Sequence, residues 1–290
     1  MVYVYFSGTE SLKVSKELAS RGITRQLVSY LYLVKKGKNI QRELDERKKA
    51  GVKIFLDSGA HTLRQHSSDA RGFHGKSKEN YIRPMAYYDS YVDDYIKFLK
   101  KYHHYFEIFV NVDIENVVGQ KKVEEWTDKI IKEVGRQPLC VWHKQGGYHL
   151  IEEYAKKYKQ IGVGRGTSAH VVSRLFIAAK KYGSKVHGFA LTDYKSISKW
   201  PFYSVDSTSW LVGSMYGLTA AFNGRKLRAI PKTQRRNYRH FCEKNNINFD
   251  NLVKDKNWEV DMFNACNWRN YINHVNSYKR NIGIEYWDDE

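Results

Sequence analysis

Short strand-like segments alternate with helix-like segments from the first residue of the chain. Eight segments rich in β-branched and aromatic residues are predicted strands, at 2–6, 27–33, 52–56, 107–112, 139–142, 160–162, 185–189 and 202–205. Amphipathic stretches lie between them, most clearly at 40–50, 87–105, 123–134, 150–158 and 171–182. This pattern predicts an α/β fold. The count of eight favours a (β/α)8 TIM barrel over a doubly wound open sheet, which shares the same local pattern.

Two parts of the chain depart from the alternation. A polar, basic segment at 62–84 follows the third predicted strand and is expected to be a loop insertion. After Asn223 the alternation stops, and residues 223–290 are basic and Trp-rich. We therefore expect a barrel over 1–222 and a small helical extension over 223–290.

The formal net charge of +18 indicates a polyanionic partner, with nucleic acid as the first candidate. The chain has no run of 18 apolar residues, so no membrane span is expected. Three cysteines leave one unpaired in any disulfide scheme, which favours a reducing, cytoplasmic compartment. The predicted nucleic-acid contacts are Arg64, Arg71, Lys76, Arg165, Arg225, Arg228, Arg235 and Arg236.

Polar or glycine-rich residues recur directly after the predicted strands. Asp57 follows the third strand, Asp113 the fourth and Asp206 the eighth. In a (β/α)8 barrel the active site lies at this carboxyl end of the strands. Asp57 and Asp206, each followed by a small hydroxyl residue, could also be simple helix caps. Two carboxylates at one barrel mouth would suit the cleavage and remaking of a glycosidic bond.

Taken in series, these segments resemble the tRNA-guanine transglycosylases. Asp-Ser-Gly-Ala at 57–60 is similar to the family's Asp-Ser-Gly-Gly motif, and Gln-Gly-Gly at 145–147 is similar to its segment after strand 5. Ile-Gly-Val-Gly at 161–164 resembles the family's substrate loop, and Asp206 falls where the nucleophilic aspartate ends strand 8. This short, basic chain looks most like the phage-type enzymes that insert 7-deazaguanine bases into DNA.

The resemblance implies a covalent exchange of bases. Asp206 would attack C1′ of a guanosine nucleotide and form a sugar–enzyme ester, while Asp57 would act as general acid/base. Asp113 would accept hydrogen bonds from the guanine-type edge of the free 7-deazaguanine base. The other residues implied to contact that base are Ser58, Gly59, Gln145, Gly146, Gly162, Val163 and Gly164.

The incoming base is expected to be neutral. In bacterial tRNA enzymes an acid in the strand 6 loop helps to select an aminomethyl group, but this chain has no Asp or Glu between positions 162 and 192. A nitrile-bearing, preQ0-like base is therefore expected rather than an aminomethyl, preQ1-like one.

The zinc site of the family, Cys-x-Cys-x-x-Cys with a later His, is absent. Another site could be formed by His240, Cys242, Cys266 and His274, although their spacing is not a recognised one. Base exchange itself is expected to need no cofactor.

Three competing functions stay open at this point. The same chemistry could act on tRNA instead of DNA. The barrel could bind nucleic acid without catalysis. A glycosylase that transfers the sugar to water would leave abasic sites.

Overall fold

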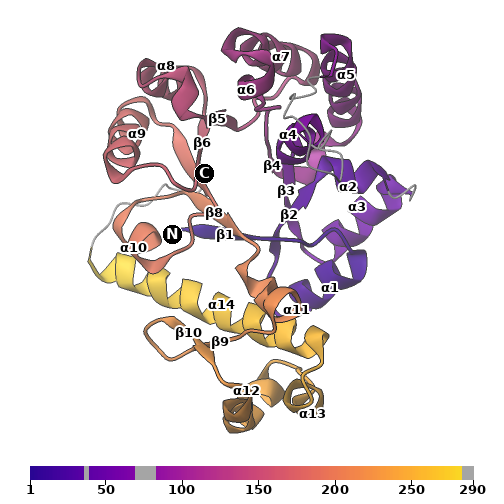
Figure 1. Cartoon of the computed structure of the whole chain (residues 1–290), viewed down its shortest axis with the longest axis vertical. Helices are drawn as coiled ribbons and strands as arrows, with labels where there is room; N and C mark the ends of the chain where they lie inside the picture. The colour runs from indigo at the N-terminus through magenta and orange to yellow at the C-terminus, as the bar shows by residue number, and fades with distance from the viewer. Residues whose placement is uncertain (36–38, 69–82, 283–290) are drawn as a thin grey trace, which may run out of the picture. The chain divides into compact units, whose positions relative to one another are not determined.

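Eight parallel strands form one sheet in the part of the chain that the structure, a computed structural model, describes: residues 1–35, 39–68 and 83–282 (Figure 1). Their order is β4-β3-β2-β1-β8-β7-β6-β5. A parallel bridge from Val110, directly after β4, to Leu139, directly before β5, joins the two ends of this order. This is the connectivity of a (β/α)8 barrel. The strands are β1 (Tyr3–Ser7), β2 (Arg25–Ser29), β3 (Lys53–Asp57), β4 (Phe106–Phe109), β5 (Cys140–Trp142), β6 (Gln160–Gly164), β7 (Lys185–Phe189) and β8 (Ser204–Ser207).

The predicted fold class is confirmed, and each predicted strand overlaps an observed one. The second is displaced, because the structure places β2 at Arg25–Ser29 and a helix, α2, at Tyr30–Lys35, where the sequence analysis extended the strand to residue 33. A short apolar run cannot be assigned to strand or helix by periodicity alone. Tyr30, the first residue of α2, packs its ring against the rings of Tyr91, Tyr95 and Phe98, and these contacts hold the start of the helix in place.

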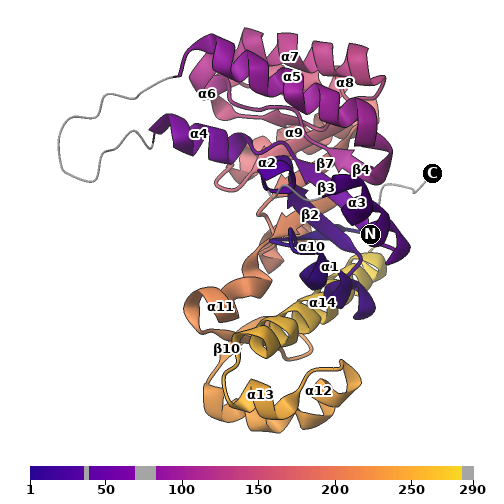
Figure 2. The same cartoon turned by 90° about the vertical axis from the view of Figure 1, so that its right-hand side faces the viewer.

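The chain divides into two compact units, and it crosses between them within β2, within the helix Ile40–Lys49, within β3 and within β7. The second unit comprises residues 28–40 and 54–186 and holds β3 to β6. Its helices α5 and α7 lie side by side, and α8 packs on α9 (Figure 2). The helices are α2, α4 (Ala60–Ser68), α5 (Met85–Tyr102), α6 (Glu115–Val118), α7 (Gln120–Val134), α8 (His149–Lys157) and α9 (Ala169–Tyr182).

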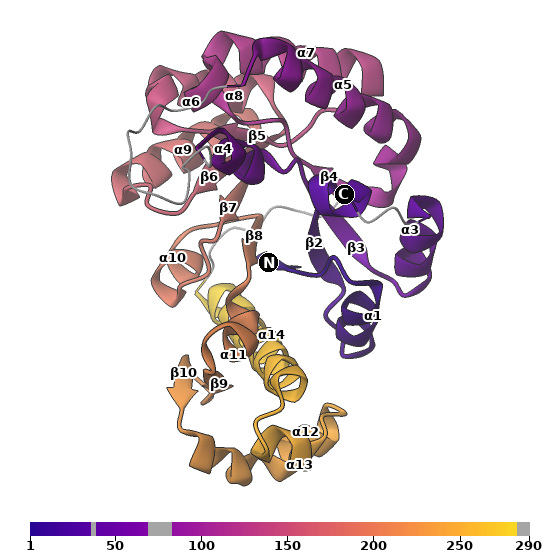
Figure 3. The same cartoon turned by 45° about the vertical axis from the view of Figure 1, so that its right-hand side comes forward.

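The first unit comprises residues 1–27, 41–53 and 187–290 and is organised around α14 (Asn257–Asn281). This helix packs against α10, α11, α13 and β9 (Figure 3). The Asn276 amide also bonds both backbone groups of Val2, at the start of β1. The other elements are α1 (Leu12–Ser20), α3 (Ile40–Lys49), α10 (Tyr194–Lys199), α11 (Val212–Tyr216), β9 (Thr219–Phe222), β10 (Leu227–Ile230), α12 (Arg239–Lys244) and α13 (Phe249–Val253).

Two segments differ in the structure from what the sequence predicts. The expected loop at 62–84 begins as a helix, since α4 continues to Ser68, and residues 69–82 lie outside the described residues. The expected boundary at 222/223 falls within the antiparallel β9–β10 hairpin, so the C-terminal part is not purely helical. Among the helices described, none combines the length and the apolar character needed to cross a bilayer.

Candidate active site

The carboxylate of Asp206 is held on both of its oxygens. Ser7, the last residue of β1, donates its hydroxyl to Oδ2 at 2.9 Å, and the backbone N–H of Ala190 donates to Oδ1 at 3.0 Å. The Nε2 atom of His187 lies 3.4 Å from Oδ1. These partners come from β1, from β7 and from the turn after β7, and β1 and β7 are the two neighbours of β8 in the sheet. The surrounding strands therefore fix the orientation of the carboxylate.

Each of these partners is itself held in place. The Nδ1 atom of the buried His187 is hydrogen-bonded to Ser204 Oγ at 2.8 Å. Ala190 adopts a φ of 54°, a left-handed conformation that is uncommon for residues other than glycine. Such strained backbone is concentrated at functional sites, and here it directs an N–H at a carboxylate. The indole of Trp210 donates to the carbonyl of Ser7 at 2.8 Å, which fixes the end of β1.

The side chain of Asp206 is 14% exposed. It is therefore shielded from most solvent while one part of it stays reachable. The sequence analysis assigned residues 7, 187 and 190 no role in the site, because no local motif shows which side chains meet across neighbouring strands.

In the second unit, Asp57 ends β3 and folds back on its own chain. Its Oδ2 atom accepts the backbone N–H of Gly59 at 2.9 Å. This Asx-type turn leads directly into α4. Gly59 has a φ of +83°, and a Cβ there would lie 2.8 Å from a methyl group of Leu31. Ser58 is fully buried, and its hydroxyl has no hydrogen-bond partner among the residues that the structure describes.

Asp113 follows β4 and pairs with a histidine that follows β5. The Nε2 atom of His143 lies 2.8 Å from Asp113 Oδ2 and 3.4 Å from Glu115 Oε1. Both carboxylate side chains are less than a tenth exposed. Sequence reasoning assigned no role to His143 or Glu115, although each stands within two residues of a predicted site residue.

The pKa values of this cluster follow from its burial and its charges. Burial lowers the pKa of His143, but the hydrogen bond to Asp113 and the negative charges of Asp113 and Glu115 outweigh it and raise that pKa above its ordinary value. Burial raises the pKa of Glu115, and the charge of His143 offsets this only in part. Arg64, a predicted nucleic-acid contact on α4, also acts electrostatically on both groups. His143 and Glu115 therefore retain protons more strongly than the free side chains do.

A pocket of about 300 Å³ lies beside this cluster, within the second unit. Its lining brings together three predicted residues: Gln145 after β5, Gly164 at the end of β6 and Arg165 directly after it. The side chain of Val163 is fully buried in β6 and does not line this pocket. The complete lining is Trp142, His143, Lys144, Gln145, Tyr148, Gly164, Arg165, Gly166, Thr167, Ser168 and Val171.

The remaining predicted base contacts are glycines that lie outside this lining. Gly162 is buried in β6. Gly146 packs tightly, since a Cβ there would lie 2.6 Å from a methyl group of Leu150 and 3.1 Å from the side chain of Gln120.

Of the predicted nucleic-acid contacts, Arg165, Arg225, Arg228 and Arg236 are exposed, and Arg64 is half-buried. Arg71 and Lys76 lie outside the described residues. The prediction for Arg235 is wrong. Its side chain is fully buried and bonds Thr219, Asp255 and a backbone carbonyl, so a phosphate in solvent does not reach it.

The possible zinc site does not assemble. Within the described part of the chain, no three His, Cys, Asp or Glu side chains are grouped closely enough to hold a metal ion. His240 is exposed, whereas Cys242 and Cys266 are fully buried. Burial raises the pKa of both thiols, which disfavours the thiolate form that zinc binds.

No model of a protein family matches the chain, and no curated protein matches it. Among solved structures, the chain is similar to a complex of a GH113 β-1,4-mannanase, with 14% sequence identity and a TM-score of 0.38. That match covers 65% of this chain and 72% of the mannanase chain.

Proposed function

We propose that the chain is a DNA-guanine transglycosylase that uses Asp206 as its nucleophile. The observation that carries the proposal is the fixed carboxylate at the end of β8, held by Ser7 and Ala190 and flanked by His187. A carboxylate suits attack on an anomeric carbon because it can bond to an electron-poor centre and later leave it. A helix cap would not need contacts from both neighbouring strands.

The exchange has two steps. In the first, a carboxylate oxygen of Asp206 bonds to C1′ of the target nucleotide, the bond from C1′ to N9 breaks, and guanine leaves with a proton supplied by Asp57. In the second, the incoming 7-deazaguanine gives its N9 proton to Asp57. Its N9 atom then bonds to C1′ while the ester bond to Asp206 breaks. Asp57 thus acts first as general acid and then as general base.

The second unit supplies the proposed recognition of the base. Asp113 accepts donors from the guanine-type edge, and the pocket between the loops after β5 and β6 takes the base substituent. The size of this pocket, about 300 Å³, is at the lower end for small-ligand sites. Its lining includes the cations Lys144 and Arg165 and no carboxylate. This charge balance supports a neutral nitrile-bearing base over a cationic aminomethyl one.

The nucleophile is tested by trapping the covalent intermediate. The protein is incubated with guanine-containing DNA and separated on a denaturing gel. We expect a protein–DNA adduct that is lost in Asp206→Asn and retained in the matched control Asp94→Asn, whose side chain is 60% exposed on α5. An adduct that persists in Asp206→Asn would remove this residue from the mechanism.

The substrate is tested by exchange of labelled guanine. The proposal expects incorporation into DNA and little into tRNA, and the reverse result would transfer the same chemistry to tRNA. Abasic sites formed without any added base would identify a hydrolytic glycosylase. An assay with the two free 7-deazaguanines tests the pocket, and a clear preference for the amine over the nitrile would contradict the proposed base.

A further inference from the structure

Three large apolar side chains are exposed together just before the C-terminal hairpin. Met215 is 55% exposed, Tyr216 is 69% exposed and Leu218 is 48% exposed. Met215 and Tyr216 end α11, and Leu218 stands directly before β9. Large exposed apolar side chains that stand within four residues of one another indicate an interaction site more strongly than single ones scattered over the surface do. We call these three side chains the apolar tip.

The hairpin that follows presents positive charge. Arg225 and Lys226 stand in its turn, and Arg228 lies on β10, all three exposed. The side chain of Asn223 accepts the backbone N–H groups of Arg225 and Lys226 at 3.1 Å and 3.0 Å, which fixes the turn. From residue 207 to residue 242 the sequence contains no Asp or Glu. The segment that carries the apolar tip therefore has a strongly positive charge, which favours a polyanion over an ordinary protein surface.

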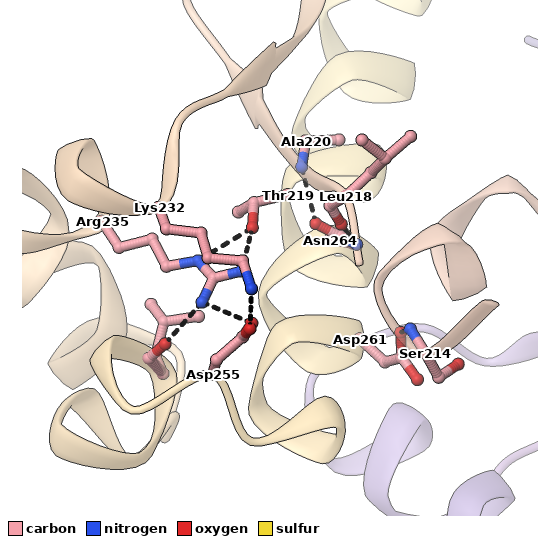
Figure 4. Close-up of polar contacts among 10 residues, drawn as sticks. Ser214, Leu218, Thr219, Ala220, Lys232, Arg235, Asp255, Asp261 and Asn264 are labelled. Atoms are coloured by element: carbon pink, nitrogen blue, oxygen red, sulfur yellow. Dashed lines mark hydrogen bonds and ion pairs between the residues drawn. The ribbon is translucent and has the colours of Figure 1, made fainter. Parts of the chain in front are cut away.

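The hairpin is mounted rigidly on α14 (Figure 4). The side-chain oxygen of Asn264 accepts the N–H of Ala220 at 2.8 Å, and its amide donates to the carbonyl of Leu218 at 3.2 Å. The side-chain oxygen of Asn267 accepts the N–H of Phe222 at 2.8 Å. Side-chain amides thus bond the edge of β9 as a third strand would.

The two ends of the apolar tip are also fixed. On one side, the N–H of Ser214 in α11 donates to Asp261 Oδ1 at 2.9 Å. On the other, the buried Arg235 donates to Thr219 Oγ1 at 2.9 Å and to Asp255 Oδ1 at 2.7 Å (Figure 4). A held backbone presents its side chains with little further loss of entropy on binding.

We propose that the apolar tip is a wedge that enters duplex DNA between stacked bases, while the hairpin cations hold the flanking phosphates. Proteins that kink or open DNA insert apolar side chains in this way, and Leu and Met are among those used. An aromatic ring such as Tyr216 can also stack on an exposed base. The role of the wedge rests on the proposed function, because an enzyme that attacks C1′ must first take its target nucleotide out of the base stack.

The wedge is tested by fluorescence without any base exchange. Duplexes carry 2-aminopurine next to guanine, and the fluorescence of this base rises when it unstacks. The wild-type protein is expected to raise the signal, and the double variant Tyr216→Ala/Leu218→Ala is expected to lose most of the rise. Stacking contacts of this kind correspond to roughly tenfold changes in binding for each base. The matched control is Tyr32→Ala, since Tyr32 is 47% exposed on α2.

A second readout separates the wedge from the chemistry. On duplex DNA the double variant is expected to lose most of its base exchange, and on single-stranded DNA it is expected to keep it. If neither the wild type nor the double variant exchanges bases on any DNA, the proposed function fails. If the fluorescence rise still differs between the two proteins, the wedge is supported independently of that function. Thermal unfolding of both variants checks that they are folded.

Two results would overturn the wedge. The first is an unchanged fluorescence rise in the double variant. The second is a wild-type dimer that dissociates in Tyr216→Ala, measured by sedimentation, because the apolar tip would then be covered by a second copy of the chain.

Discussion

Two aspartates at strand ends have very different surroundings in this chain. Asp57 bonds the N–H two residues further on, which is a contact any turn-forming aspartate can make. Asp206 receives donors from two other strand ends, and one of them comes from a backbone in a strained conformation. Contacts of the second kind do not arise from local turn formation. They distinguish a positioned carboxylate from a cap.

The hydroxyl of Ser7 should matter for the rate of the proposed reaction rather than for DNA affinity. Ser7→Ala removes one of the two donors on the Asp206 carboxylate, and a hydrogen bond to a charged group contributes about 1.5–3 kcal/mol. We expect kcat for base exchange to fall roughly 10- to 100-fold while the Kd for DNA stays constant. Steady-state kinetics and a binding titration measure the two quantities. Ser198→Ala, at a half-buried position on α10, is the control.

His143 should give the protein a pH-dependent stability. The folded-state pKa of His143 is raised above its ordinary value of 6.5. The pairing of His143 with Asp113 therefore adds its full contribution to the free energy of unfolding below pH 6.5. This contribution is lost as the pH rises through the folded-state pKa. The difference in unfolding free energy between wild type and His143→Gln should therefore shrink as the pH rises from below 6.5 through the folded-state pKa. Urea unfolding across this range measures it, with the exposed His170→Gln as control. A difference that is constant with pH would contradict the assignment.

The sequence indicated some of these residues and not others. Asp57, Asp113 and Asp206 could be found because each directly follows an apolar run that the β pattern marks as a strand. Glu115 and His143 stand close to such positions, but only the fold shows that they meet. Arg235 could not be told from its exposed neighbours, because a run of cations carries no signal for which one points inward.

At the scale of elements, the hairpin is the clearest feature that the sequence analysis missed. Its turn contains Asn223-Gly224, a strong hairpin signal when it stands between two short strands. The eight barrel strands were found because each is a β-rich run bounded by turn residues. The strand at 27–33 was placed too late because its apolar residues continue into α2 without a change of composition.

The amide of Asn264 should control the stability of the hairpin. Asn264→Ala leaves the N–H of Ala220 and the carbonyl of Leu218 without these partners, and loss of a buried partner costs about 1–3 kcal/mol. We expect faster hydrogen exchange at 219–230, while exchange in the barrel strands is unchanged. Hydrogen-exchange mass spectrometry compares the variant with Asn273→Ala, an exposed position on the same helix. Equal exchange in the two variants would show that the hairpin does not depend on this bond.

At the scale of the whole molecule, the charge of +18 should make nucleic-acid binding depend steeply on salt. Each phosphate contact contributes about 0.9 to the slope of log K against log salt on duplex DNA. Arg225→Gln/Arg228→Gln should therefore lower the slope by about 2. Titrations at several salt concentrations measure it, with Lys97→Gln, a 75% exposed position on α5, as control. A double variant with the same slope as the wild type would show that the DNA phosphates contact other parts of the protein.

The burial of Arg235 has a consequence for mutational mapping of this surface. In an alanine scan of the basic run from Arg225 to Arg239, the variant with the greatest loss of DNA binding would be expected to be Arg235→Ala. That loss would reflect unfolding around Thr219 and Asp255 and not a missing phosphate contact. A ranking of the positions by lost affinity alone would then place a buried structural residue first among the DNA contacts. Each variant therefore has to be scored for foldedness before its affinity is compared.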